Sequence, residues 1–239
     1  MHVLILPSWY PETPDDISGS FFREQALALQ QAGCKVGVIA PAMTSLRHPL
    51  KALRADRSIR MELDSGITTY RKTAVNWTPR VWPLSALLVK RIGMQLYRAY
   101  VAVHGRPDVI HVHASLLAGV VAMEIAKQYA IPYVLSEHSS AYGRGLISAP
   151  GMRIARAVAE NAGLRFAVST PFARLLEEQL TLPIARFSVM PNIVDHTFLD
   201  APLPIRDKSK TRFLHVILLD FKKRVDLIIR AFANQFPKN

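Results

Sequence analysis

Two histidines and a Glu–His pair follow apolar segments in the middle of the chain. The segment PDVIHVHAS places His111 and His113 two residues apart, so both side chains are expected on one face of a strand. The segment IPYVLSEHSS places Glu137 and His138 where the next apolar run ends. His138 can hydrogen-bond a ligand hydroxyl or stabilise a leaving group, and Glu137 can orient it or pair with an arginine. A structural cap of the strand is the alternative.

Metal binding and nucleophilic catalysis find little support in the sequence. No cysteine, histidine or carboxylate near His111 and His113 completes a ligand set, because Asp108 precedes the strand, and we expect no metal. There is no G-x-S-x-G motif and no cysteine placed with a suitable histidine. The single cysteine, Cys34, is expected to be a small core residue, and its lack of a disulfide partner suits a reducing compartment.

A glycine-bearing loop after the first apolar run is the candidate anion site. The loop from Pro7 ends in Ser18, Gly19 and Ser20, directly before a helical segment. Backbone N–H groups at a helix N-terminus, beside a glycine that permits close approach, suit a diphosphate. The chain has neither G-x-G-x-x-G nor G-x-x-x-x-G-K-[ST], so nicotinamide and P-loop functions lose their main support. The alternative is a glycine that only makes a turn.

Short apolar runs alternate with helical segments along most of the chain. Strands are expected at 3–6, 36–40, 109–112, 133–136, 164–168 and 187–190, and helices at 21–32, 116–129, 154–161 and 171–179. This alternation predicts an α/β fold, a doubly wound parallel sheet of Rossmann-like type, with ligands at the carboxyl ends of the strands. The first helix has Ser18 or Ser20 as its expected N-cap and Gly33 as its stop.

Residues 41–83 interrupt this pattern with proline, tryptophan and basic residues, and predict a long irregular excursion. A helix follows over 84–103. Its predicted apolar face consists of Leu84, Leu87, Leu88, Ile92, Leu96, Ala99 and Val103. With Lys90, Arg91 and Arg98 on its flank, the helix can rest on an anionic membrane surface or pack on the sheet.

The chain is basic, and the excess is uneven. The 239 residues hold 30 Lys and Arg against 18 Asp and Glu, a net charge of +12, and twelve basic residues against three acidic ones lie between Arg47 and Arg106. This stretch favours an anionic partner, either membrane headgroups or a lipid-diphosphate acceptor, with an unpartnered charged surface as the alternative. Nucleic acid is disfavoured because no stacking platform interleaves the basic residues.

The remaining features concern location and domain boundaries. No apolar run of about 18 residues and no secretory leader pattern occurs, so we expect neither a membrane span nor secretion, and a cytoplasmic location. Residues 200–212, rich in proline and charge, predict a linker. A strand at 213–219 and a helix at 225–232 follow, too little to stand alone as a domain.

Taken together, these segments resemble the retaining glycosyltransferases of family 4, which have the GT-B fold of two Rossmann-like domains with the active site between them. The resembling segments are LPSWYPETPDDISGSFFREQ, DVIHVHAS, PYVLSEHSS, AVSTPFARLL, VMPNIVDHTF and LLDFKKRVDLIIRAFA. The resemblance implies an acceptor-side Rossmann-like domain at 1–199, the N-terminal half of such an enzyme, a linker at 200–212, and the first strand and helix of a truncated donor-binding domain at 213–239.

The resemblance also implies roles for particular residues. Ser18, Gly19 and Ser20 would face the phosphates and sugar of the donor, and Lys223 matches a lysine that holds the donor diphosphate. His138 matches the histidine that contacts the transferred sugar and is the candidate catalytic residue. Candidate acceptor or sugar contacts are His113, Glu137 and Asn192.

Three positions depart from the family pattern. Ile193 replaces the glycine of PNGVD, Leu218 stands where many members have arginine, and Arg224 stands where glycine is usual. The E-x7-E carboxylates that hold the nucleotide and sugar in the family lie beyond the end of this chain. We therefore expect little or no transferase activity from these 239 residues alone.

The leading prediction is thus a glycosyltransferase of polysaccharide or glycolipid biosynthesis. Its donor is a nucleotide-sugar and its acceptor is a glycan or a lipid-linked glycan. Such an enzyme needs no metal or other cofactor, because cationic side chains and a helix N-terminus stabilise the departing nucleotide diphosphate. The alternatives are a non-catalytic membrane-associated or binding remnant, and a sugar-nucleotide epimerase of the same architecture.

Overall fold

The computed structural model describes residues 1–13, 15–45, 52, 56–78, 81–183, 186–194, 196–202, 209, 211–217 and 223–236. Asp195 and Leu218 lie outside these residues, as does most of the predicted linker. The chain divides into two compact units, Met1–Leu199 and Asp200–Asn239.

The first unit is built on an eight-stranded sheet with the order β3-β4-β2-β1-β5-β6-β7-β8. The strands are β1 His2–Pro7, β2 Lys35–Ser45, β3 Arg60–Asp64, β4 Ile67–Asn76, β5 Val109–His113, β6 Tyr133–Glu137, β7 Leu164–Ala167 and β8 Ser188–Val189. Neighbouring strands are parallel except β3 and β4, which are antiparallel. The predicted parallel α/β sheet is confirmed.

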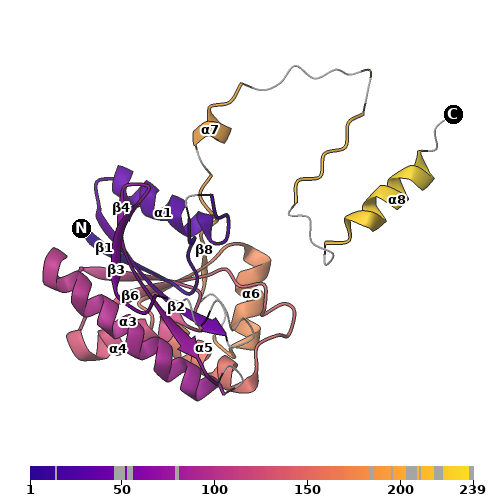
Figure 1. Cartoon of the computed structure of the whole chain (residues 1–239). Coiled ribbons are helices and arrows are strands. Elements are labelled where there is room, and N and C mark those ends of the chain that lie inside the picture. The colour runs from indigo at the N-terminus through magenta and orange to yellow at the C-terminus, as the bar shows by residue number, and fades with distance from the viewer. Residues whose placement is uncertain are drawn as a thin grey trace. The chain divides into compact units, whose positions relative to one another are not determined.

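Helices cover both faces of this sheet (Figure 1). They are α1 Ser20–Gln31, α3 Trp82–His104, α4 Ala118–Tyr129, α5 Ala149–Asn161 and α6 Thr170–Gln179. The short α7 His196–Leu199 follows β8, and its Phe198 and Leu199 are exposed. Alternate residues of β1 point to opposite faces: Val3 and Ile5 pack in the core beneath α1, whereas Leu4 and Leu6 pack in the core beneath α3 and α4. The continuous burial of β1 is typical of a central parallel strand.

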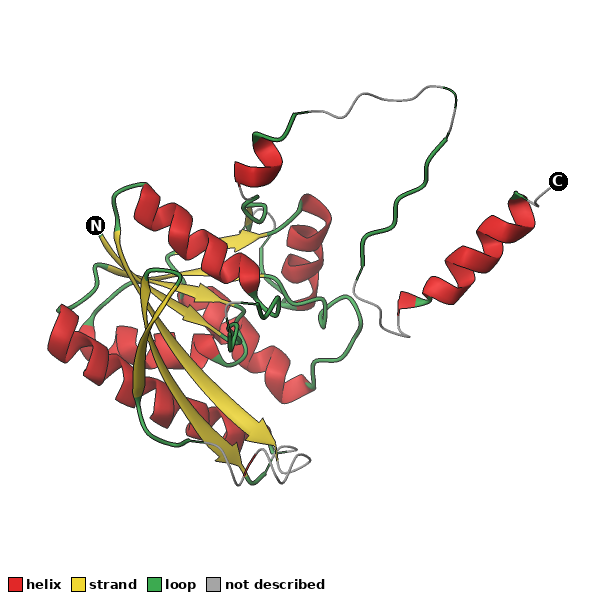
Figure 2. Cartoon of the chain, turned by 45° about the horizontal axis from the view of Figure 1, so that its top comes forward, coloured by secondary structure: helices red, strands yellow, loops and turns green. Residues whose placement is uncertain are grey.

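The predicted irregular excursion at 41–83 is wrong over much of its length. β2 continues to Ser45, and β4 runs parallel to it from Gly37↔Thr68 to Ser45↔Asn76. Figure 2 shows two long strands extending past the rest of the sheet. β3 joins β4 through a tight turn at Ser65 and Gly66, whose φ angles of 51° and 85° suit a hairpin.

The predicted apolar face of the helix at 84–103 is partly wrong. Leu84, Leu87 and Val103 are 47%, 57% and 69% exposed. The helix instead packs through a face that includes Gly93, where an added Cβ would lie 2.5 Å from the methyl carbons of Val121. This close approach between α3 and α4 rotates the leucines of the first turns outward.

The second unit has no buried side chain among its described residues. The helix predicted at 225–232 is confirmed as α8 Val225–Gln235. The predicted strand is wrong for residues 213–217, which have no strand pairing; no described neighbour offers them backbone partners. Within the described residues of the chain, no helix is both long and apolar enough to span a bilayer.

Candidate functional site

The carboxyl ends of β1, β5 and β6 meet at one edge of the sheet and form the candidate site. The backbone N–H of Ser8 donates to the carbonyl of His113 at 2.9 Å, and the Ser8 hydroxyl donates to the carbonyl of Ala114 at 2.7 Å. The same hydroxyl accepts from the N–H of Ala118 at 3.0 Å. Ser8 therefore ties the loop after β1 to the loop after β5.

Gly19 caps α1, and the predicted N-caps Ser18 and Ser20 are wrong. Its φ of 81° is left-handed, and no side chain caps the helix. An added Cβ would lie 2.9 Å from Cδ1 of Trp9, so the glycine is required by packing as well as by its backbone conformation. No side-chain acceptor occupies the first turn, although the N–H groups of Ser20 and Phe22 donate to the carbonyls of Ile17 and Gly19. The positive end of the α1 dipole favours an anion at this position.

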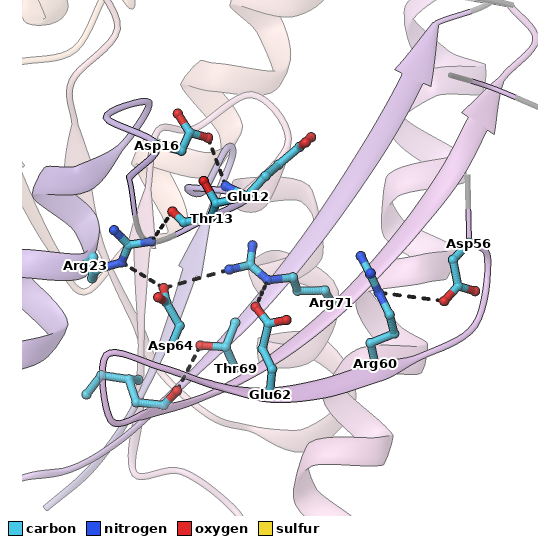
Figure 3. A network of polar contacts seen from close by, with 11 residues as sticks. Glu12, Thr13, Asp16, Arg23, Asp56, Arg60, Glu62, Asp64, Thr69 and Arg71 are labelled. Atoms are coloured by element: carbon cyan, nitrogen blue, oxygen red, sulfur yellow. Dashed lines mark hydrogen bonds and ion pairs between the residues drawn. The ribbon is translucent and has the colours of Figure 1, made fainter. Parts of the chain in front are cut away.

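A buried ionic network holds this loop against the β3–β4 hairpin (Figure 3). Nε of Arg23, on α1, lies 2.9 Å from Oδ2 of Asp64, and its Nη2 donates to the carbonyl of Thr13 at 2.9 Å. Arg71 lies 3.8 Å from the same Asp64 oxygen and stacks on the ring of Tyr10, 5.1 Å from its centroid. Tyr10 and Thr13 of the loop are thus held by two arginines, Arg71 of β4 and Arg23 of α1, that share Asp64.

Asp16 organises the exposed part of the same loop. Its carboxylate accepts from the N–H of Glu12 at 2.9 Å and from the N–H of Ser18 at 2.8 Å. These hydrogen bonds lower the pKa of Asp16. Asp16 therefore holds the backbone of the loop that precedes Gly19 in place.

Three histidines lie together beneath the first turn of α1. Nδ1 of His113 lies 3.1 Å from Nε2 of His138, and the ring of His113 stacks on that of His111 with centroids 4.2 Å apart. Phe22, from α1, packs against His113 at 4.7 Å. The structure thus brings together the histidines of β5 and β6, which are neighbouring strands.

Burial keeps these histidines neutral. It lowers the pKa of His111 to about 3 and that of His138 to about 4, and it holds the pKa of His113 well below its ordinary value. A hydrogen bond with the side chain of Asn192 opposes the shift at His138. At neutral pH His138 is therefore a hydrogen-bonding group that carries a single N–H and no charge.

Glu137 is a buried acceptor for the backbone that carries His138. Its carboxylate accepts from the N–H groups of Ser115, His138 and Ser139 and from the hydroxyls of Ser115 and Tyr142. The expected arginine partner is absent from these contacts. Glu137 thus fixes the turn after β6. Sequence reasoning missed Tyr142, which no motif marks.

A cavity of about 210 Å³ opens beside this turn. It is lined mainly by carbon atoms; its walls are Ser8, Trp9, Trp82, Ala114, Ser115, Leu116, Leu117, Glu137 and Ser139. We call it the strand-end cavity. The two tryptophans come from the loop after β1 and the first turn of α3, and no sequence motif predicts that both line one cavity.

The other predicted site residues lie outside this cluster or in the second unit. Asn192 is exposed in the segment after β8, near His138. Lys223 is exposed and belongs to the second unit. Nowhere in the described part of the chain do three His, Cys, Asp or Glu side chains gather closely enough to hold a metal ion.

Comparison with known proteins identifies similar sequences and folds. The family model described as Glycosyltransferase Family 4 matches residues 18–198. A protein of Bacillus subtilis strain 168, provisionally named teichuronic acid biosynthesis glycosyltransferase TuaC, is 29% identical over 151 residues, which are 59% of this chain and 36% of that protein.

Two solved structures share the fold. The catalytic domain of starch synthase IV from Arabidopsis thaliana, bound to ADP and acarbose, has a TM-score of 0.53 at 12% identity, with 80% of this chain and 51% of that chain covered. UDP-GlcNAc 2-epimerase from Neisseria meningitidis, bound to UDP-GlcNAc, has a TM-score of 0.50 at 16% identity, with 80% and 46% covered. This chain thus spans about a third to a half of these relatives.

Proposed function

The chain belongs to glycosyltransferase family 4, and we propose that it is the acceptor-side part of a retaining enzyme that transfers a sugar from a nucleotide-sugar to a glycan or lipid-linked acceptor. The observation that carries this proposal is the family match over 18–198, which spans α1 and the β5 and β6 strand ends. The B. subtilis relative is named for teichuronic acid biosynthesis, which supports a role in polysaccharide or glycolipid biosynthesis.

The N-terminus of α1 is the proposed site for the donor phosphates. Ser18, Gly19 and Ser20 line the approach, and the helix end has no side-chain acceptor of its own. Lys223 is proposed as a donor-binding residue on the resemblance of its own segment to the family pattern. With these charges, the reaction takes no metal ion or other cofactor.

His138 is proposed to hydrogen-bond the transferred sugar or the leaving group. Its imidazole is neutral at pH 7, so it acts through its one N–H or its lone pair and not as a cation. His113 touches it at 3.1 Å and Glu137 holds its backbone, so the ring is positioned before the substrate arrives. Asn192 is proposed to contact the same ligand.

The strand-end cavity is proposed to hold a sugar ring. Trp9 and Trp82 offer flat apolar surfaces, which suit the apolar face of a pyranose. A sugar-nucleotide epimerase is supported only by likeness of fold, at a TM-score of 0.50. The family match favours the transferase.

We expect the 239-residue polypeptide alone to transfer little sugar, because no described side chain of its second unit is buried and a complete donor-binding domain needs a core. A radiolabelled transfer assay with a panel of nucleotide-sugars tests this expectation. Turnover comparable to that of a full-length relative would refute it.

Donor binding is tested separately by isothermal titration with the same nucleotide-sugars. Weak binding that is lost in Gly19→Ala and kept in Gly33→Ala supports the donor site, because both glycines have left-handed φ and only Gly19 borders the site. Epimerised nucleotide-sugar, detected by chromatography without any acceptor, would favour the epimerase instead.

The protein is also proposed to act in the cytoplasm, at the inner face of the membrane, if its acceptor is lipid-linked. The support is the basic stretch and the exposed Leu84 and Leu87 of α3. Sedimentation with anionic and with neutral vesicles tests this location, and binding should weaken with salt. A non-catalytic remnant would bind vesicles and no nucleotide-sugar.

A further inference from the structure

A second cavity, of about 520 Å³, lies between the end of β4 and the first turns of α3. We call it the β4–α3 pocket. Three cations line it: Arg57 from the segment before β3, Lys72 from β4 and Arg91 from α3. No acidic side chain is among its described lining residues.

Three of the eight described basic residues of the basic stretch line this pocket. Four of its described members are engaged elsewhere: Arg60 pairs with Asp56, Arg71 with Glu62 and Asp64, Lys90 with Glu124, and Arg106 donates to the carbonyl of Tyr129. Of the five described members that have no carboxylate partner within the described residues, three line the pocket, whereas Arg98 and Arg106 do not. Among the described residues, most cations of the stretch that lack a carboxylate partner therefore lie at this pocket.

The lining of the pocket suits a phosphate group attached to an apolar chain. Two guanidinium groups and an ammonium group match phosphate oxygens, and the Lys72 ammonium also donates to the carbonyl of Arg57 at 2.7 Å, which holds the two residues together. Trp77 and Leu84, 67% and 47% exposed, border the pocket on its solvent side. Oε1 of Gln95 is buried there without a partner among the described residues, so a ligand hydroxyl can satisfy it.

We propose that the β4–α3 pocket binds the phosphate or diphosphate of the acceptor. This inference rests on the proposed function, because it takes the ligand to be a sugar acceptor. Trp82 lines the strand-end cavity and Leu84, two residues further along, lines the β4–α3 pocket, so both cavities border the first turn of α3.

The pocket is distinct from the proposed donor site. Its walls come from β4 and α3, whereas the donor site lies at α1, after β1, and β2 separates β1 from β4 in the sheet. The anion that it takes is therefore not the donor diphosphate bound at Gly19.

The test is titration of the full 239-residue protein with two soluble probes, inorganic pyrophosphate and geranyl diphosphate, followed by calorimetry and by tryptophan fluorescence. Arg91→Gln and Lys72→Gln remove pocket cations. Arg98→Gln is the matched control, since it removes the same charge from the same helix, two turns away from Arg91 and outside the pocket. We expect the pocket variants to weaken binding by at least about tenfold, since each removes a charge-assisted hydrogen bond. The control should change it by less than about twofold.

The outcomes separate the sources of the anion. Equal small losses in all three variants would mean a diffuse basic surface and would overturn the proposal. Binding only to anionic phosphatidylglycerol vesicles, with neither soluble probe bound, would assign the pocket to membrane headgroups and would also overturn it. Trp77→Phe should remove the fluorescence change and keep the calorimetric signal, which would place the probe in this pocket.

A last pair of variants separates this proposal from the proposed function. Nucleotide-sugar binding should respond to Gly19→Ala and not to Arg91→Gln, and geranyl diphosphate binding should show the reverse. If Gly19→Ala abolishes the binding of both ligands and Arg91→Gln affects the binding of neither, the pocket proposal fails and the donor site stands. If nucleotide-sugars do not bind and Arg91→Gln weakens only the diphosphate probes, the pocket stands as a diphosphate site and the donor assignment fails.

Discussion

Asp64→Asn tests whether the buried ionic network holds the loop before α1 in place. Asp64 comes from β3 and contacts Arg23 of α1 at 2.9 Å and Arg71 of β4 at 3.8 Å (Figure 3). The substitution keeps the shape of the side chain and removes its charge, so two buried guanidinium groups lose a shared carboxylate. Asp56→Asn, in the exposed pair with Arg60, is the control.

The magnitude follows from burial. The side chains of Arg23, Asp64 and Arg71 are 7%, 4% and 10% exposed. Removing one partner of a buried ion pair costs about 3–5 kcal/mol of folding free energy. In the variant, Arg71 still pairs with Glu62, and Arg23 still donates to the Thr13 carbonyl. The loss of folding free energy should therefore be at the lower end of this range, about 3 kcal/mol. In a domain of this size that lowers Tm by roughly 6–12 °C.

Urea denaturation followed by circular dichroism gives the free energies of unfolding of the two variants and the parent protein. We expect Asp64→Asn to lower the free energy of unfolding by about 3 kcal/mol. Asp56→Asn should lower it by less than about 0.5 kcal/mol, because the side chains of Asp56 and Arg60 are both about half exposed. The m-value should not change. If Asp64→Asn costs less than about 1 kcal/mol, Asp64 is not the electrostatic anchor of this network.

Three further predictions concern the candidate site. Burial lowers the pKa of His111 to about 3 and of His138 to about 4, so unfolding takes up protons below pH 6.5. Stability should therefore be constant just above pH 6.5 and fall toward pH 4. In urea denaturation, His138→Gln should reduce the dependence of the midpoint on pH without abolishing it, because burial also lowers the pKa of His111 and His113; an unchanged pH dependence would refute the role of His138. Gly19→Ala should lower the stability by about 1–2 kcal/mol for its left-handed φ, plus the cost of displacing Trp9. This loss of stability should exceed that of Gly33→Ala, where no atom lies within 4 Å of the added Cβ. Equal losses in thermal denaturation would refute the contact with Trp9. Tyr142→Phe should lower the stability by about 1–2 kcal/mol, because the Tyr142 hydroxyl lies 2.7 Å from that of Ser115 and 3.4 Å from Glu137. Tyr129→Phe is the control and should change the urea midpoint little, because the Tyr129 hydroxyl has no hydrogen bond with the described residues.

The parts of the fold that the sequence predicted are those where local pattern and burial agree. β5 and β6 are apolar runs at the centre of the sheet, and their neighbouring positions explain why His113 meets His138. The sequence pattern did not predict β4, because its buried positions include Thr69 and Arg71. An arginine can be buried there because the carboxylates of Glu62 and Asp64 both pair with it. These ion pairs form only in the folded structure, so the hydrophobic periodicity of the sequence does not reveal them.

The same limit applies to the site. The spacing of Ser18, Gly19 and Ser20 pointed to the start of α1, yet which of them caps the helix depended on Trp9, whose indole packs where a Cβ would lie. The face of α3 depended on Gly93, because contact with Val121 turns Leu84 outward. In both places a glycine decides the packing, and its effect becomes visible only once its neighbour is placed.

β4 connects the two proposed sites. Arg71 and Lys72 are consecutive, so their side chains point to opposite faces of the sheet. Arg71 faces α1 and joins the network that fixes the donor loop, whereas Lys72 lines the β4–α3 pocket beside α3. Lys72 also pairs in register with Pro41 of β2, so the strand cannot slip without moving both side chains. The register of β4 therefore sets the position of the proposed acceptor phosphate relative to the donor loop. Sequence periodicity did not predict this strand.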